Sequence, residues 1–194
     1  MKLAIKNNPW NVSRGFPGSH SVKLMHEKLL NWKINGELNV PVFDKSLRNG
    51  LGDRSHWRLD NPDLLILEGW FLGIKPYSID INDRPINTTN LTLDESSYVL
   101  KIQNNLNEYL DIWTLIDNIW HLKPLKIEYM NIWKTNQEKE MFLQKGNALQ
   151  DEKLSNFLRM LNVSIPHKSF DMINSYALLL IDQERNLVEA GLNF

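Results

Sequence analysis

Two short runs of apolar residues constrain the fold of this chain more than any other feature. They are Leu64-Leu65-Ile66-Leu67 and Tyr176-Ala177-Leu178-Leu179-Leu180-Ile181. Each run has the length of a strand and lacks alternating polar positions, so both faces of such a strand would be buried. Strands of this kind are typical of parallel sheets that are covered by helices on both faces. We therefore expect these two runs to lie inside a parallel sheet.

Segments with helical periodicity alternate with further strand candidates. Apolar residues at steps of three and four predict a helix from Val22 that ends at Gly36, a second helix from Asp94 or Ser96 to 116, and further helices over 126–144 and 151–161. Shorter β-prone stretches predict strands at Val40–Phe43, at Ile119–Leu122 and at Leu187-Val188, the last of which pairs back on the run that ends at Ile181. Residues 7–20 and 75–93 are rich in turn formers and predict loops. Alternating strands and helices indicate an α/β fold.

Length and composition exclude several classes of protein. The chain has 194 residues, which suits a single domain over 1–194 or a fragment of a larger one. The net charge of −1 gives no electrostatic reason to expect nucleic acid or an anionic membrane as a partner. The absence of cysteine excludes a disulfide scaffold and a thiol nucleophile. No apolar run is long enough to span a bilayer, and Met1–Lys6 turns polar too early for a signal peptide, so we expect a cytoplasmic protein.

Two carboxylates directly follow predicted strands. Asp44 follows the strand at Val40–Phe43, and Glu68 follows the strand at Leu64–Leu67. If these strands are parallel, the two acids share one edge of the sheet, where ligands of open α/β sheets bind. Carboxylates in that place hold Mg²⁺ in phosphate-transfer folds. The loop after Asp44 adds cations and flexible backbone that could approach an anion: Lys45, Arg48, Arg54, Gly50 and Gly52. The pattern favours phosphoryl transfer over acyl transfer or redox chemistry.

A purely structural interpretation stays open for each of these residues. A polar loop of mixed charge is commonly a solvated loop with neutralising pairs, and Arg54 could pair with Asp53 or Asp44 to hold it in shape. His20 is alone in its loop, which is more typical of a hydrogen-bonded structural residue. The other histidines show no spacing of zinc ligands.

Four motifs in order resemble the D-glycerate 3-kinase family, which are P-loop kinases related to uridine kinase and phosphoribulokinase. Arg14-Gly15-Phe16-Pro17-Gly18-Ser19-His20 resembles the family's Arg-Gly-x-Pro-Gly-Thr-His loop. Phe43-Asp44-Lys45-Ser46 with Gly50-x-Gly52-Asp53-Arg54 resembles its Asp-Lys-Ser signature, and Leu67–Gly73 resembles its Glu-Gly-Trp-x-x-Gly segment. Trp133–Glu138 resembles its lid helix, so the lid would span about 126–150. The resemblance covers 9–145, and the tail from 150 fits loosely.

The resemblance implies a P-loop kinase-like three-layer fold, with a parallel sheet and helices on both faces. It implies ATP and Mg²⁺ as cofactors and transfer of the γ-phosphate to a hydroxyl of a small hydroxy acid such as D-glycerate. Asp44 would be the general base or hold Mg²⁺, and Glu68 would orient Mg²⁺ through water. Arg14, His20, Lys45 and Arg54 would bind the carboxylate or the transferring phosphate. Lys134 would contact the nucleotide phosphates from the lid, positioned by Gln137 and Glu138. For Glu138 the alternative is an i, i+4 pair with Lys134.

One part of the family pattern is missing. The chain contains no Gly-x-x-x-x-Gly-Lys-Ser/Thr loop, and its lid has Lys134 where the family usually has Arg. The strand that precedes this loop lies in the middle of the family's sheet, so we expect a gap beside the remaining strands. Two hypotheses follow: a kinase that needs a separate or preceding segment carrying the P-loop, or a truncated, non-catalytic relative that binds anions or partners.

Overall fold

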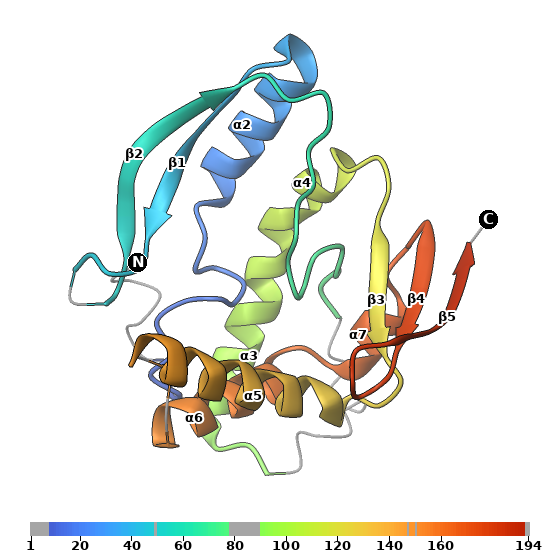
Figure 1. The fold of residues 1–194 in the computed structure, drawn as a ribbon. Helices are drawn as coiled ribbons and strands as arrows, with labels where there is room; N and C mark the ends of the chain where they lie inside the picture. The colour runs from blue at the N-terminus through green and yellow to red at the C-terminus, as the bar shows by residue number, and fades with distance from the viewer. Residues whose placement is uncertain (1–7, 49, 78–89, 147, 150, 193–194) are drawn as a thin grey trace.

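The computed structural model describes residues 8–48, 50–77, 90–146, 148–149 and 151–192 (Figure 1). Its helices are α2 (Val22–Asn35), α3 (Leu93–Leu106), α4 (Leu110–Thr114), α5 (Glu128–Lys145), α6 (Asp151–Ser164) and α7 (His167–Asp171), and a 3-10 turn, η1 (Asn107–Tyr109), joins α3 to α4. Its strands are β1 (Leu38–Asp44), β2 (Asp53–Asp60), β3 (Trp120–Pro124), β4 (Ala177–Ile181) and β5 (Leu187–Leu192). The expected α/β fold is confirmed.

The first sheet is a two-stranded hairpin. β1 and β2 pair antiparallel, with Leu38 opposite Asp60 and Asp44 opposite Asp53. The strand predicted at Val40–Phe43 is confirmed as part of β1, whereas β2 was not predicted because its residues are polar. Most of β2 is exposed, so it needs no apolar pattern.

The second sheet has the order β3-β4-β5. β3 and β4 are parallel, with Trp120 opposite Ala177, and β5 returns antiparallel to β4. The predicted strands at Ile119–Leu122, Tyr176–Ile181 and Leu187-Val188 are confirmed within one or two residues at their starts. Among the described strands, only β3 and β4 pair in parallel. The edge of β3 that faces away from β4 has no strand partner among the described residues.

The prediction of a buried strand at Leu64–Leu67 is wrong for this chain as it stands. These residues are extended but pair with no strand, and the side chains of Leu64 and Ile66 are each 75% exposed. An apolar run becomes a sheet strand only when a neighbouring strand satisfies its backbone N–H and C=O groups. The parallel pairing that would bring Asp44 and Glu68 to one sheet edge is also absent, since β1 pairs with β2 alone in the described part of the chain.

The helices predicted from Val22, over 126–144 and over 151–161 are confirmed with adjusted ends, whereas the helix predicted to reach 116 is divided into α3, η1 and α4. α2 ends where expected, because Gly36 takes a left-handed conformation (φ 73°) and its N–H donates to the Trp32 carbonyl at 2.7 Å. α3 begins one to three residues earlier than Asp94 or Ser96, since Thr92 caps it in a reciprocal capping box with Glu95. α7 was not predicted.

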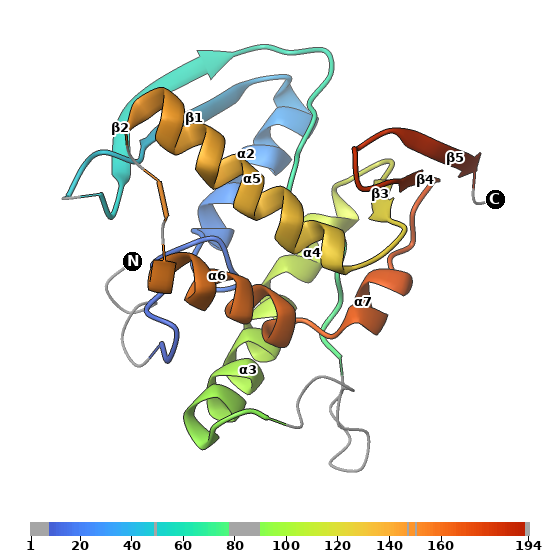
Figure 2. The ribbon, with the colours of Figure 1, turned by 60° about the horizontal axis from the view of Figure 1, so that its bottom comes forward.

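The core consists of two apolar clusters that share α3 and its continuation. One cluster gathers Trp10, Phe16, Tyr98, Ile102 and Met160, and brings the N-terminal loop, α3 and α6 together. Figure 2 shows α6 crossing α3. The other cluster joins α2, residues 70–74, η1, α4 and the start of α7. No helix among the described residues is both long and apolar enough to cross a membrane.

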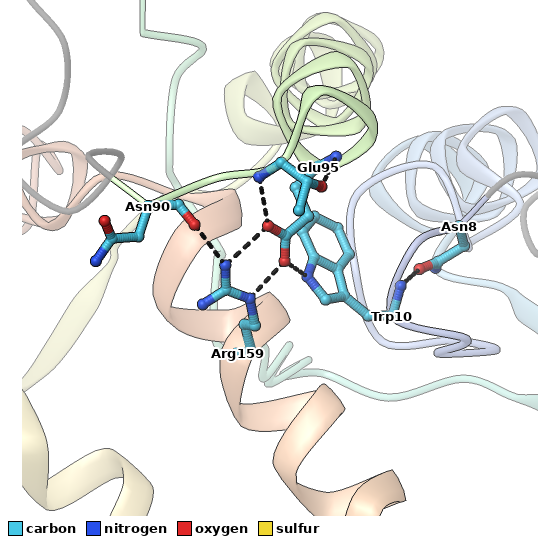
Figure 3. A network of polar contacts seen from close by, with 6 residues as sticks. Asn8, Trp10, Asn90, Glu95 and Arg159 are labelled. Carbon is cyan, nitrogen blue, oxygen red and sulfur yellow. Dashed lines mark hydrogen bonds and ion pairs between the residues drawn. The ribbon is translucent and has the colours of Figure 1, made fainter.

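A buried carboxylate holds the first cluster together (Figure 3). Glu95 accepts hydrogen bonds from the Trp10 indole at 2.8 Å and, through both oxygens, from the Arg159 guanidinium, which also donates to the Asn90 carbonyl at 2.9 Å. The Arg159 hydrogen bond is the main reason why the pKa of Glu95 falls from 4.5 to about 2. The network ties the N-terminal loop to α3 and α6.

Candidate functional site

The loop over residues 14–20 is held in one shape by hydrogen bonds from four directions. The Ser19 hydroxyl accepts from the amides of Gly15 and Phe16, and the Trp70 indole donates to the Gly15 carbonyl at 2.6 Å. The Asn105 amide donates to the Pro17 carbonyl at 3.2 Å, and the Gly18 amide donates to the Tyr109 hydroxyl, also at 3.2 Å. The loop that resembles a substrate loop is therefore preorganised by residues far from it in sequence.

Arg14 connects this loop to the hairpin turn. Its guanidinium donates to the carbonyls of Gly50 and Leu51, each at 2.9 Å, and lies over the Phe43 ring at 5.9 Å from the centroid. The predicted anion contact of Arg14 is untested, but these bonds use only one of its nitrogens. A guanidinium has five N–H groups, so donors remain for an anion.

Asp44 lies at the end of β1 and opens a tight turn. One carboxylate oxygen accepts from the Ser46 amide at 2.8 Å and from the Ser46 hydroxyl at 2.6 Å. These two hydrogen bonds, the hydroxyl first, lower the pKa of Asp44. The other oxygen has no hydrogen-bond partner in the described structure, and neither has the exposed ammonium of Lys45.

The expected partner of Arg54 is engaged elsewhere. Asp53 forms an ion pair with Arg48 and accepts the backbone N–H of Arg54 at 2.8 Å. That backbone bond is the first cause of the lowered pKa of Asp53. The Arg54 guanidinium is exposed, with no ion pair to any described residue, so it is available to a ligand.

His20 closes the loop and packs on aromatic rings. Its ring is stacked on Phe71, with centroids 5.7 Å apart, and its Nδ1 lies 3.0 Å from the Tyr109 hydroxyl. Burial of this part of the ring lowers the pKa of His20, although the residue as a whole keeps an exposed surface. His20 is therefore hydrogen-bonded, as the structural interpretation expected, and still reachable by a ligand.

The expected gap in the sheet is present as an open groove of about 1360 Å³. Its walls are the extended segment 63–70, residues 115–125 with β3, and the inner side of α5. In Figure 1 the green segment that contains Leu64–Leu67 runs beside yellow β3, with no strand of the described residues between them. Three predicted site residues line the groove: Glu68, Lys134 and Gln137.

On α5, which the resemblance predicts to be the lid helix, the alternative interpretation holds for Glu138, because its i, i+4 pair with Lys134 is formed. The Lys134 ammonium lies 2.5 Å from the Glu138 carboxylate and forms no second ion pair with a described residue. It also donates a hydrogen bond to Gln137 at 3.1 Å and lies 5.1 Å from the centroid of the Phe157 ring. Glu138 is buried and also accepts the Leu149 amide at 2.7 Å. Lys134 thus binds within α5 and to α6 in this structure, and a nucleotide phosphate would have to compete with Glu138.

The predicted residues fall into two groups that one loop connects. Glu68, Lys134 and Gln137 line the groove, whereas Asp44, Lys45 and Arg54 lie at the turn of the hairpin; no contact joins Asp44 to Glu68. The loop over 14–20 bridges the groups, since Trp70 bonds to it beside Glu68 and Arg14 bonds from it to the hairpin turn.

Sequence patterns alone did not identify Tyr109 and Trp70 as loop-anchoring residues. Both occupy helix or turn positions that predict only packing. The available signal is chemical: a buried Tyr or Trp needs a partner for its O–H or N–H, and a glycine-rich loop supplies unpaired backbone groups.

The proteins similar to this chain include proteins named as kinases. No family model matches the chain. It is 30% identical over 161 residues to the "Uncharacterized kinase mug58" of Schizosaccharomyces pombe, covering 78% of this chain and 57% of that protein. It is 29% identical over 208 residues to the "Probable ATP-dependent kinase TDA10" of Saccharomyces cerevisiae, covering 94% of this chain and 67% of that protein. The chain thus spans only part of the length of these curated relatives.

Two solved structures share the fold. A D-glycerate 3-kinase from Cryptococcus neoformans var. grubii superposes with a TM-score of 0.83 at 24% identity, over 99% of this chain and 73% of that one. The YGR205w protein superposes with a TM-score of 0.69 at 29% identity, over 98% of this chain and 71% of that one. The chain thus has the fold of the first structure, has relatives by sequence that are named as kinases, and carries the four motifs in order.

Proposed function

We propose that this chain forms the substrate-binding and lid part of an ATP-dependent kinase that phosphorylates a hydroxyl of a small hydroxy acid, D-glycerate by resemblance. The proposal includes a segment that this chain lacks, with an apolar strand and a Gly-x-x-x-x-Gly-Lys-Ser/Thr loop. Such a loop supplies the amides and the lysine that hold the β- and γ-phosphates of a nucleotide.

The observation that carries the proposal is the groove between Leu64–Leu67 and β3. Each wall presents an extended edge toward the groove that has no strand partner among the described residues, and Glu68 directly follows Leu64–Leu67. A strand inserted there would complete a parallel sheet and place its following loop near Glu68, because ligands of open α/β sheets bind outside the carboxyl ends of the strands.

The residues at the site have the chemistry that phosphoryl transfer needs. The Asp44 carboxylate, which is ionised at neutral pH, would accept the proton as the substrate O–H bond breaks. The freed oxygen then bonds to the γ-phosphorus while the bond to the β-phosphate oxygen breaks, which yields the phosphate ester and ADP. Arg14, His20, Lys45 and Arg54 would hold the acid's carboxylate or the transferring phosphate.

Glu68 fits a role toward Mg²⁺ better than Asp44 does. Its carboxylate is exposed on the groove with no hydrogen-bond or ion-pair partner in the described structure, whereas one oxygen of Asp44 is committed to Ser46. Mg²⁺ takes one or two carboxylates, keeps several waters and binds phosphate oxygens, so the lack of a cluster of three metal-binding side chains among the described residues is compatible with it. When bound, Mg²⁺ neutralises charge on the nucleotide phosphates.

The proposal is tested by coupled ADP release with Mg-ATP and D-glycerate. We expect no turnover from the 194-residue chain and turnover from the same chain joined at Met1 to a segment with an apolar strand and the Gly-Lys-Thr loop, here called the joined protein. The matched control replaces the lysine of that loop by alanine. A folded joined protein that binds ATP but phosphorylates no small hydroxy acid would contradict the proposed reaction.

The alternative is a non-catalytic relative that binds an anion or a partner. It is favoured by the absence of a Gly-Lys-Ser/Thr loop from these 194 residues. The same assay separates the two, because a non-catalytic relative stays inactive in the joined protein while its site still binds D-glycerate in calorimetry.

A further inference from the structure

The Tyr109 hydroxyl meets the 14–20 loop at two points. Tyr109 is fully buried in η1, and its ring packs edge-on against Phe71 and His20. Its hydroxyl oxygen lies 3.2 Å from the Gly18 amide and 3.0 Å from Nδ1 of His20. The buried Tyr109 hydroxyl therefore contacts His20, the titratable residue at the end of the loop.

Counting protons fixes the direction of these two hydrogen bonds. The Gly18 amide can only donate, so it uses a lone pair of the phenol oxygen. The phenol proton then has one acceptor within reach in the described structure, Nδ1 of His20. If His20 were protonated, Nδ1 would carry a proton of its own and the buried phenol proton would lose its acceptor, which is unfavourable. The neutral ring with its proton on Nε2 is the state that satisfies every group.

The surroundings of the ring favour the same state. Phe71 covers one face of His20, and burial lowers its pKa, so the neutral form is preferred. No described charged side chain forms an ion pair or hydrogen bond with the ring; Glu108 on η1 acts as a negative charge on Tyr109, and the cause of the lowered pKa of His20 is burial alone. Nε2 has no hydrogen-bond partner among the described residues, and the residue keeps an exposed surface.

We propose that Tyr109 is a positioning residue that holds His20 as a neutral imidazole, with its single N–H on Nε2 offered to an anionic oxygen of the ligand. The inference rests on the proposed function for the identity of that ligand and deepens it by assigning the protonation state. His20 then acts as a neutral hydrogen-bond donor and not as a cation or a general base, and Arg54 and Lys45 supply the positive charge.

The protonation state of His20 can be measured on the 194-residue chain itself, because the measurement requires no enzymatic activity. Long-range ¹H–¹⁵N NMR of the histidine rings should show Nδ1 of His20 unprotonated and Nε2 protonated at pH from about 6 to 8. In Tyr109→Phe the pKa of His20 should rise toward its ordinary value, because the neutral form loses its donor. Tyr129→Phe, which removes a hydroxyl on α5, should leave the His20 signals unchanged. A wild-type ring protonated on Nδ1, or a His20 pKa insensitive to Tyr109→Phe, would overturn the assignment.

The joined protein tests the consequence for the ligand. His20→Gln retains a neutral N–H near the position of Nε2 and should keep most of the activity, whereas His20→Ala should lose at least about tenfold in kcat/KM, the value of one hydrogen bond to an anion. A rise in KM for the hydroxy acid assigns the bond to its carboxylate, and a fall in kcat assigns it to the transferring phosphate. Equal loss in Gln and Ala variants would contradict a donor role. An inactive joined protein would count against the proposed function, while the NMR result would still decide the role of Tyr109.

Discussion

Among single residues, Asp44 carries the chemical step of the proposed reaction. One of its carboxylate oxygens has no hydrogen-bond partner among the described residues and the group is ionised at neutral pH, so it can accept a proton. We expect Asp44→Asn to lower kcat of the joined protein by about 10²- to 10⁴-fold, the usual contribution of a general base, with little change in stability. Steady-state ADP release measures this.

The matched control for Asp44 is Asp60→Asn. Asp60 lies at the other end of the same hairpin, where it pairs with Arg58, and it should retain near-normal turnover. A near-normal rate in Asp44→Asn would remove Asp44 from the mechanism.

Glu95 makes stability depend on pH. Its folded pKa of about 2 lies below the ordinary 4.5, so its contribution is complete above about pH 4.5 and is lost as the pH falls toward 2. Because Arg159 is 42% exposed, screening by solvent reduces this contribution to about 1–2 kcal/mol. We expect Glu95→Gln to lower the free energy of unfolding by that amount at pH 7 and by progressively less toward pH 2, as measured by urea denaturation.

Glu152→Gln is the control for Glu95, since Glu152 is exposed in the first turn of α6. A stability difference between wild type and Glu95→Gln that stays constant from pH 7 to pH 2.5 would refute the assigned pKa shift.

At the scale of elements, a buried acid on α5 connects this helix to the segment that follows it. Glu138 neutralises Lys134 and accepts the Leu149 amide, so removing it leaves an ammonium and a backbone donor without their partner. We expect Glu138→Ala to lower the free energy of unfolding by about 2 kcal/mol. Glu140→Ala, exposed on the same helix, should change it by less than about 0.5 kcal/mol. Equal effects in urea denaturation would show that the buried pair contributes nothing.

The helices and strands show what the local sequence can and cannot predict. Gly36 ended α2 as expected, because a left-handed C-cap is a local property. The run Leu64–Leu67 has the composition of a central strand, yet it pairs with nothing, because a strand also requires neighbours. β2 was missed for the opposite reason: it has a partner in β1 but an exposed, polar sequence.

For the molecule as a whole, the sequence predicted local contacts better than contacts between residues far apart in the chain. The pairing of Lys134 with Glu138 followed from helical spacing. The bond of Arg14 to the hairpin turn and that of Tyr109 to His20 join residues 36 to 89 positions apart, and no local pattern specifies such contacts. The sequence did not predict that Asp44 and Glu68 lie apart in the structure. Their expected proximity required Val40–Phe43 and Leu64–Leu67 to be strands of one parallel sheet, and the described residues do not form that sheet.

The central claim, that the groove receives a strand, is tested most directly by amide hydrogen exchange at Leu64–Leu67 and Trp120–Leu122. In the 194-residue chain the amides of these segments that face the groove bond to no strand and should exchange rapidly, and in the joined protein their exchange should slow by about a hundredfold or more as a ladder forms on both walls. The amides of β5, on the far edge of its sheet, should not change. A folded, joined protein whose groove amides exchange as fast as before would contradict the account.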